Sequence, residues 1–275
     1  MASYDEVNAA REYLQKKIPF KPLVGLICGS GLGNLRDGIK NQIVIPYEDI
    51  PNFPKCTVEG HFGNLVFGTI GNKHVMLMQG RLHGYEGYTQ QQAIRLMKLM
   101  GCEYLICTNA TGSVHLDYNV GDLMVVKDHI SIPALAGFNP LCGPNDERFG
   151  TRFPALSDVY TKELRQLTFS VAEEMGIMNK MHEGVYMYVF GPTFDTIAED
   201  RALRLLGADV LGMSLTAETT VAHHCGMKVL AIALVTNRCT FERGKPQSTH
   251  QEVLQAGLES SKIITCLITQ VLEKL

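Results

Sequence analysis

Val24-Gly-Leu-Ile-Cys-Gly-Ser-Gly-Leu-Gly33 is the stretch of this sequence that decides its fold. The apolar run from Val24 to Cys28 is short and ends at a glycine, which favours a buried strand of a parallel sheet over a helix. The glycines that follow allow a tight turn with its N–H groups aimed at one point, and Ser30 adds a hydroxyl donor. The stretch therefore predicts a strand followed by an anion-binding loop.

The spacing of this loop differs from two common phosphate-binding motifs. Its glycines follow G-x-G-x-G, and Asn34 stands where the dinucleotide-binding fingerprint has its third glycine. No Gly-Lys-Ser or Gly-Lys-Thr follows, so the loop is not a Walker motif. On spacing alone, a plain strand-to-helix turn remains an alternative to an anion site.

Length and composition favour one enzyme-sized domain with small-molecule partners. We expect a single domain over residues 1–275, because the 275 residues are 45% hydrophobic. The net charge is −3 without a basic cluster, which argues against nucleic acid. We expect no membrane association, since the longest aliphatic run, Val229 to Val235, is too short to span a bilayer and no secretory signal is visible.

Eight scattered cysteines without a C-x-x-C pair indicate reduced thiols and a cytoplasmic location. We expect no metal site. His223-His224-Cys225 has no further ligands at a suitable spacing.

Strands alternate with helices along most of the chain. This pattern predicts an α/β fold with a mixed, largely parallel sheet flanked by helices. Gly71-Asn72 predicts the turn of a hairpin. Asn109 to Ser113 is expected to form a turn after a strand over 104–108, and Ser214 to cap a helix over 215–224. The long connection from Pro133 to Pro154 is expected to form a binding wall or an interface.

Polar side chains follow several of the expected strands and indicate a shared binding site. In the Gly-rich segment Gln79–Tyr88, Arg81 is suited to binding an oxyanion through two hydrogen bonds. His61 is a further loop candidate, although a lone histidine is often structural. No G-x-S-x-G nucleophile motif occurs, so the attacking group is expected to be a bound molecule. The strand-end residues are Ser30, Arg81, His83, Asn109, Asp195, Ser214 and Asn237.

The sequence resembles the trimeric, low-molecular-mass class of purine nucleoside phosphorylases from about Val24 to Gly257. The resemblance rests on several motifs taken together. They are Cys28-Gly-Ser-Gly-Leu-Gly33, Gly80-Arg-Leu-His-Gly-Tyr-Glu-Gly-Tyr88, Thr108-Asn-Ala-Thr-Gly112, Gly143-Pro-Asn-Asp-Glu-Arg-Phe-Gly150, Gly191-Pro-Thr-Phe-Asp195, Gly207-Ala-Asp-Val-Leu-Gly-Met-Ser214 and Thr236-Asn237.

The resemblance implies a role for each matching position. Phosphate would be held by Ser30, His61, Arg81, His83, Ala110 and Ser214. The sugar would contact Tyr85, Met213 and His250, and the base would contact Phe194, Asp195, Asn237 and a neighbouring subunit's copy of Phe153. The catalytic residues would be His83, Asn237 and Asp195.

The implied activity is the reversible phosphorolysis of inosine- and guanosine-type nucleosides. Inorganic phosphate would be a co-substrate, no cofactor would be needed, and the protein would be a homotrimer. Alternatives are a phosphorylase with relaxed base selectivity that includes pyrimidine nucleosides, a non-catalytic nucleoside-binding relative, and a nucleoside hydrolase. A nucleoside hydrolase would need an Asp-rich cluster near its N-terminus, and this sequence does not contain one.

The sequence departs from the family pattern mainly around the base. Asp195 replaces the usual glutamate, and the missing methylene shortens its reach by about 1.5 Å. Thr111 and Ser113 replace smaller residues, Ser214-Leu-Thr-Ala-Glu218 replaces Ser-Thr-Val-Pro-Glu, and the segment from Tyr88 to Arg95 is shorter. These changes favour relaxed base selectivity as a hypothesis.

Overall fold

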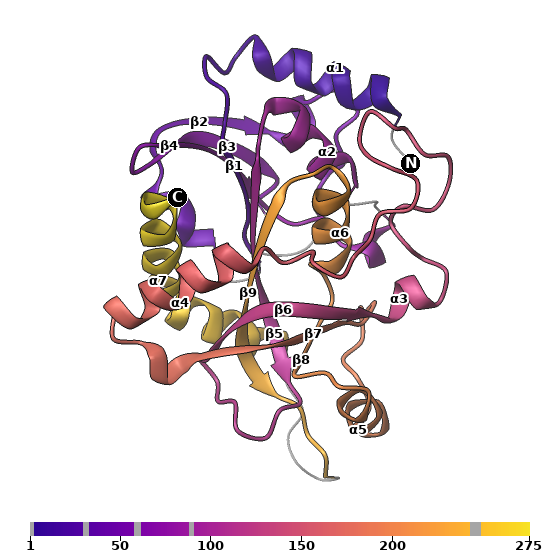
Figure 1. Ribbon diagram of the computed structural model, residues 1–275, viewed down its shortest axis with the longest axis vertical. Coiled ribbons are helices and arrows are strands. Elements are labelled where there is room, and N and C mark those ends of the chain that lie inside the picture. The colour runs from indigo at the N-terminus through magenta and orange to yellow at the C-terminus, as the bar shows by residue number, and fades with distance from the viewer. Residues whose placement is uncertain (1–2, 30–32, 58–61, 88–90, 243–248) are drawn as a thin grey trace.

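The computed structural model describes residues 3–29, 33–57, 62–87, 91–242 and 249–275. One mixed sheet runs through it, with helices on both sides (Figure 1). The strands are β1 (Val24–Ile27), β2 (Lys40–Pro46), β3 (Asn64–Ile70), β4 (Lys73–Gln79), β5 (Tyr104–Ser113), β6 (Leu123–Ser131), β7 (Met181–Tyr188), β8 (Val210–Gly212) and β9 (Lys228–Arg238). The helices are α1 (Tyr4–Gln15), α2 (Gln91–Met100), α3 (Ile132–Leu135), α4 (Lys162–Glu174), α5 (Ile197–Leu205), α6 (Thr216–His224) and α7 (His250–Lys274).

The strand that the opening motif predicted lies inside the sheet. β1 pairs in parallel with β4 on one side and with β5 on the other. The predicted hairpin around Gly71-Asn72 is also confirmed, because β3 and β4 pair antiparallel from Asn64–Gln79 to Ile70–Lys73. β1 therefore ends between two longer strands, and its exit loop starts beside both of them.

The second half of the sheet closes on itself. The strand order is β2-β3-β4-β1-β5-β8-β7-β6-β9, and β9 pairs with β5 as well. The ring contains parallel pairs, such as β5–β9, and antiparallel pairs, such as β6–β9. The prediction of a mixed α/β sheet is confirmed, and the ring places the ends of β5, β8 and β9 close together.

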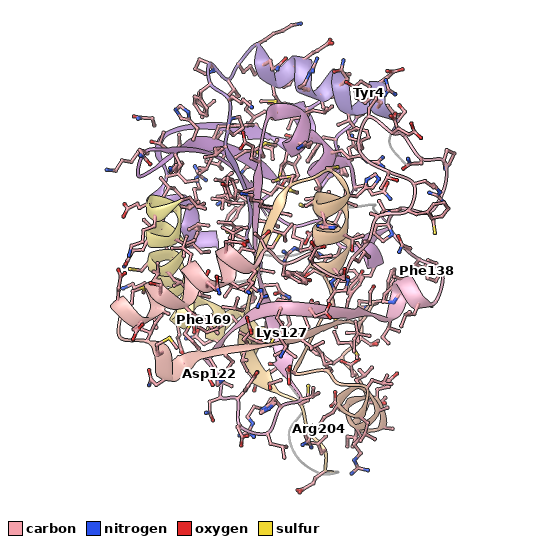
Figure 2. The ribbon with its side chains drawn as sticks, viewed as in Figure 1. Tyr4, Asp122, Lys127, Phe138, Phe169 and Arg204 are labelled. Carbon is pink, nitrogen blue, oxygen red and sulfur yellow. The ribbon has the colours of Figure 1, made fainter. Side chains whose placement is uncertain are left out.

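Side chains fill the spaces between the sheet and the helices (Figure 2), and those of β1 alternate between two of the hydrophobic cores. Ile27 packs with residues of α1, α2 and α6 on one face of the sheet, while Leu26 packs with residues of α4 and α7 on the other. This is the two-residue period of a strand that is covered on both sides. No described helix is long and apolar enough to cross a lipid bilayer.

Two local expectations are wrong. Asn109 to Ser113 does not form a turn, because β5 continues to Ser113 and pairs with β9 along this length. Ser214 does not cap α6, which begins at Thr216 without a side-chain cap. The residue before it, Leu215, has a φ of 77°, a conformation that is unusual for leucine. The chain makes a sharp turn there, so Ser214 belongs to the turn and not to the helix.

Candidate active site

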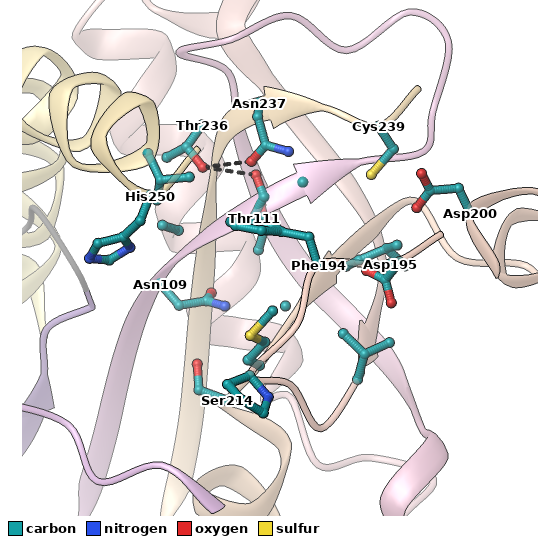
Figure 3. A pocket seen from close by; sticks show the side chains of 18 of the residues that line it. Asn109, Thr111, Phe194, Asp195, Asp200, Ser214, Thr236, Asn237, Cys239 and His250 are labelled. Atoms are coloured by element: carbon teal, nitrogen blue, oxygen red, sulfur yellow. Dashed lines mark hydrogen bonds between the residues drawn. The ribbon is translucent and has the colours of Figure 1, made fainter. Parts of the chain in front are cut away.

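A cavity of about 430 Å³ lies where the ends of β5, β8 and β9 meet (Figure 3). The loops after β4 and β7 and the beginning of α7 complete its wall. The lining residues are Arg81, His83, Tyr85, Asn109, Ala110, Thr111, Gly112, Val189, Pro192, Phe194, Asp195, Asp200, Leu211, Gly212, Met213, Ser214, Thr236, Asn237, Arg238, Cys239, Thr240, His250 and Val253.

Arg81 provides the positive charge of one wall. It is 1% exposed, its Nε donates to Glu218 Oε1 at 2.8 Å, and its Nη1 donates to the carbonyl of Thr108 at 3.0 Å. Burial is the largest single influence and lowers the pKa of Arg81, but the interactions with Glu218, Cys107 and Tyr186 together outweigh it, so the pKa is raised. The guanidinium is therefore charged and held in one orientation, as binding an anion requires.

His83 lies beside Arg81 and is oriented by its own turn. Its backbone N–H donates to Glu86 Oε2 at 3.0 Å, and Nδ1 lies 3.4 Å from the same oxygen. The ring stacks on Tyr85 with the centroids 4.7 Å apart. The Glu86 carboxylate at Nδ1 and the stacked ring of Tyr85 therefore hold the imidazole of His83 in one orientation.

The backbone of β5 contributes an unpaired edge to this wall. β1 pairs with β5 only as far as Cys107, and β8 pairs with it only at Gly112 and Ser113. Neither strand pairs with the intervening residues, which include Ala110. Gly29, at the exit of β1, approaches this edge so closely that a Cβ there would lie 2.6 Å from the Cα of Asn109. The loop predicted to bind an anion therefore starts beside the backbone of Ala110.

Tyr186 connects the floor of the cavity to this wall. Its buried hydroxyl donates to the carbonyl of Ser214 at 2.9 Å and accepts a hydrogen bond from Asn109 Nδ2 at 3.0 Å. Gly212 is required nearby, since a Cβ there would lie 2.3 Å from the tyrosine oxygen. Burial holds the pKa of Tyr186 well above its usual range, so the hydroxyl stays protonated and keeps donating. The network fixes Ser214 relative to β5.

We expect Tyr186→Phe to loosen this wall. The substitution leaves the carbonyl of Ser214 and the amide of Asn109 without their partner, which costs about 1–3 kcal/mol in the free energy of unfolding. Phosphate affinity should fall about 3- to 10-fold because Ser214 is no longer held. Urea denaturation and phosphate titration measure the two effects. Tyr104→Phe, at the opposite end of β5, is the matched control, and an equal loss in both variants would contradict the assignment.

Met213, Tyr85 and His250 line the middle of the cavity. A Cβ on Gly191 would lie 2.5 Å from Met213 Sδ and 3.2 Å from Tyr85 Cδ1, so these two side chains meet over that glycine. His250 is the first residue of α7, where Thr249 caps the helix by accepting from the N–H of Glu252. The cap fixes the direction in which His250 enters the cavity.

The far wall carries the groups suited to a planar, polar ring. Phe194 offers an aromatic face, and the pKa of the neighbouring Asp195 is raised by burial and then by Glu199. Asn237 Oδ1 accepts from Thr236 Oγ1 at 3.2 Å, which leaves its Nδ2 to act as a donor. The carbonyl of Thr111 also lies 3.2 Å from Thr236 Oγ1, so the single hydroxyl proton is shared between these two acceptors. The hydrogen bond from Thr236 therefore orients the side-chain amide of Asn237.

The hydroxyl groups of Thr111 and Ser113 are not available to bind a base, although the sequence suggests that they could be. Thr111 Oγ1 donates to the carbonyl of Leu234 at 2.8 Å, and Ser113 Oγ donates to the carbonyl of His115 at 3.2 Å. Both hydroxyls bond to backbone carbonyls of the protein. Any relaxed selectivity must therefore come from other residues.

Most of the predicted site residues line this one cavity. They are Arg81, His83, Tyr85, Ala110, Phe194, Asp195, Met213, Ser214, Asn237 and His250. Phe153 does not line it and is 85% exposed. Ser30 and His61 lie outside the described residues. Within those residues, no group of three or more His, Cys, Asp or Glu side chains is placed to hold a metal ion.

Sequence reasoning missed three side chains of the site. Tyr186 lies in the second half of β7, where most side chains are buried, and has the pattern of a core residue. Asp200 is in the first turn of α5, where an exposed acid is ordinary, and Cys239 is a lone thiol. Only the arrangement in space identifies them, because no motif includes them.

An anion-binding wall beside a wall for a planar ring, at the end of such a sheet, is the arrangement of a nucleoside-cleaving phosphorylase. The family model described as Phosphorylase superfamily matches residues 23–273. The chain belongs to the purine nucleoside phosphorylase family within that superfamily.

Individual relatives cover almost the whole chain. The mouse (Mus musculus) purine nucleoside phosphorylase is 41% identical over 277 residues, which cover 99% of this chain and 96% of the mouse protein. The Schistosoma mansoni enzyme in complex with inosine is 43% identical, with a TM-score of 0.96 and coverage of 99% and 97% of the two chains. Its isoform 2, in complex with cytosine and ribose-1-phosphate, is 40% identical, also with a TM-score of 0.96 and coverage of 99% and 97%.

Proposed function

We propose that this protein catalyses the reversible phosphorolysis of purine nucleosides of the inosine and guanosine type. The products are the free base and ribose or deoxyribose 1-phosphate. One observation carries the proposal: a buried, charged guanidinium at Arg81 and an oriented amide donor at Asn237 line the same cavity. Relatives named purine nucleoside phosphorylase at this level of identity support it.

The geometry suits a displacement at the anomeric carbon. Phosphate, held by Arg81, His83, Ser214 and the N–H of Ala110, forms a bond from one oxygen to C1′ while the glycosidic bond breaks. The sugar becomes cation-like, and the phosphate charge stabilises it. The bonding electrons leave with the base, and the Asn237 amide donates to the purine nitrogen that becomes negative. Because this charge is largest in the transition state, the contact raises the rate rather than merely the affinity.

We propose three further properties with this activity. Phosphate is the co-substrate, and no cofactor or metal takes part. The assembly is a homotrimer in which Phe153, exposed in a single chain, reaches a neighbour's base site. The location is the cytoplasm, which the eight free cysteines support.

Relaxed base selectivity is the second candidate. The short carboxyl at Asp195 leaves more room at the base end than a glutamate would, and its raised pKa brings a neutral form closer to physiological pH. The isoform 2 relative in complex with cytosine supports a site that admits pyrimidines. Inosine and guanosine remain the expected best substrates, since the amide of Asn237 suits an oxo group.

We expect inosine and guanosine to be cleaved only when phosphate is present. The test is a panel of purine and pyrimidine nucleosides, assayed with and without phosphate and analysed for free base and sugar 1-phosphate. A pyrimidine that is also cleaved would favour relaxed selectivity. Cleavage that continues without phosphate would indicate a hydrolase, and binding without turnover would indicate a non-catalytic relative; either result would contradict the proposal.

A further inference from the structure

Asp200 brings a second carboxyl group to the base end of the cavity. It lies on the inward face of α5 with Leu203, and these two are the buried residues of the helix. Asp200 is 5% exposed and lines the same cavity as Asp195 and Asn237. Figure 3 shows its carboxyl group pointing toward the sulfur of Cys239. A buried carboxyl on a helix face that packs against apolar residues is costly unless it has a partner.

Asp200, Cys239 and Asn237 form one edge of the base site. The thiol of Cys239 lies near the Asp200 carboxyl group and lowers its pKa. Cys239 in turn lies beside the amide of Asn237, because a Cβ on Gly112 would be 3.0 Å from Cys239 Sγ and 3.0 Å from Asn237 Nδ2. A ring that accepts a hydrogen bond from Asn237 would therefore lie at the same edge of the cavity as this carboxyl group.

No cation offsets Asp200 within the described part of the chain. None of the ion pairs found there includes it. The charged groups around it are Asp195 before α5, Glu199 on α5 and Arg238 on β9, and the guanidinium of Arg238 donates to the carbonyl of Leu116. Burial, followed by Asp195 and Glu199, raises the pKa of Asp200 to about 6, although the Cys239 thiol lowers it. Both protonation states are therefore accessible near neutral pH.

We propose that Asp200 is a second base-recognition residue, which accepts a hydrogen bond from an exocyclic amino group next to the ring position that Asn237 contacts. The substrate class is the amino-substituted nucleosides, adenosine and cytidine, in addition to the oxo-substituted ones. This inference rests on the proposed function, because it assigns the base end of the same site.

The hydrogen-bond pattern of the bases explains the expected selectivity. In adenine, N7 accepts from Asn237 Nδ2 while the neighbouring 6-amino group donates to the Asp200 carboxylate. In hypoxanthine, the 6-oxo group meets that carboxylate as a second acceptor, so it binds well only when Asp200 is protonated and donates. The ionised form thus favours amino bases, and the neutral form favours oxo bases.

The test compares Asp200→Asn with the wild-type enzyme on adenosine, cytidine and inosine. At neutral pH the carboxamide is the same size as the carboxylate and can donate to an oxo group, so kcat/KM for inosine should rise, whereas kcat/KM for adenosine and cytidine should fall about 10- to 100-fold. Asp200→Ala, checked for folding by thermal unfolding, should lose the amino substrates equally. Asp117→Asn makes the same change of charge at an exposed position and should leave the ratio unaltered.

The pH profile gives an independent readout. In the wild-type enzyme the adenosine-to-inosine ratio of kcat/KM should fall between about pH 7.5 and about pH 5, because protonation converts Asp200 from acceptor to donor, and it should be flat in Asp200→Asn. The residues that hold phosphate and the sugar act on both substrates, so their contribution cancels in the ratio.

Two results would overturn the inference. One is an unchanged substrate ratio in Asp200→Asn. The other is a wild-type enzyme that neither cleaves adenosine or cytidine nor is inhibited by them. Wild-type activity on inosine distinguishes a failure of this inference from a failure of the proposed function. If inosine were not cleaved, the proposed function itself would be contradicted.

Discussion

Asn237→Ala is expected to lower kcat for inosine phosphorolysis by about 100- to 1,000-fold, with a much smaller change in the affinity for inosine. The reason is that the amide donates to a ring nitrogen whose negative charge grows as the glycosidic bond breaks. An interaction that strengthens only in the transition state contributes to kcat, whereas one that is equally strong in the bound substrate contributes to KM.

The measurement is steady-state kinetics at saturating phosphate, with single-turnover experiments to isolate the chemical step. Asn8→Ala replaces an asparagine of α1, a helix that does not line the cavity, and serves as the control. Thr236→Val provides an intermediate case. It removes the hydroxyl that orients Asn237, so we expect a loss of about tenfold in kcat. A rise in KM at constant kcat in Asn237→Ala would contradict the assigned role.

The sequence was sufficient to predict most of the strands and helices, and most of the candidate site residues line one cavity. β1 and the β3–β4 hairpin follow from local patterns, namely an apolar run that ends in glycine and an Asn-containing turn. The strand ends converge because loops at the same edge of a sheet face one another, which needs no knowledge of distant contacts. Arg81 and Asn237 were therefore predictable as neighbours across a cavity.

The rest depends on contacts between segments that are far apart in the sequence. Asn109 to Ser113 contains small, turn-forming residues, but pairing with β9 keeps the segment extended. Leu215 adopts its positive φ although no local feature of the sequence favours one. Tyr186 resembles any core residue, and its function arises only because Asn109 and Ser214 converge on its hydroxyl. Strand pairing, an unusual backbone angle and contacts to one hydroxyl each depend on several distant segments, so no single segment of the sequence predicts them.

Glu218, the partner of Arg81, is another residue that is distant in the sequence, and we expect its removal to have a large effect on stability. We expect Glu218→Ala to lower the free energy of unfolding by about 3–5 kcal/mol in phosphate-free buffer. Glu218 is 2% exposed on α6, and its carboxylate faces the buried Arg81 guanidinium across 137 positions of the sequence. Removing it leaves a buried positive charge without this counterion, a loss comparable to a third or more of the stability of a typical domain.

Phosphate should restore part of this stability, because the bound anion can replace the missing carboxylate next to the guanidinium. We therefore expect the stabilisation by saturating phosphate to be larger in the Glu218 variants than in the wild-type protein. Glu218→Gln keeps the acceptor for Arg81 Nε and loses only the charge, so it should fold even if Glu218→Ala does not. Urea denaturation with and without phosphate measures both quantities, and Glu174→Gln, which removes an exposed carboxylate paired with Lys274, is the matched control. Equal stabilisation of the wild-type protein and Glu218→Gln by phosphate would mean that the anion does not bind beside Arg81, and the phosphate site would then have to lie elsewhere in the cavity.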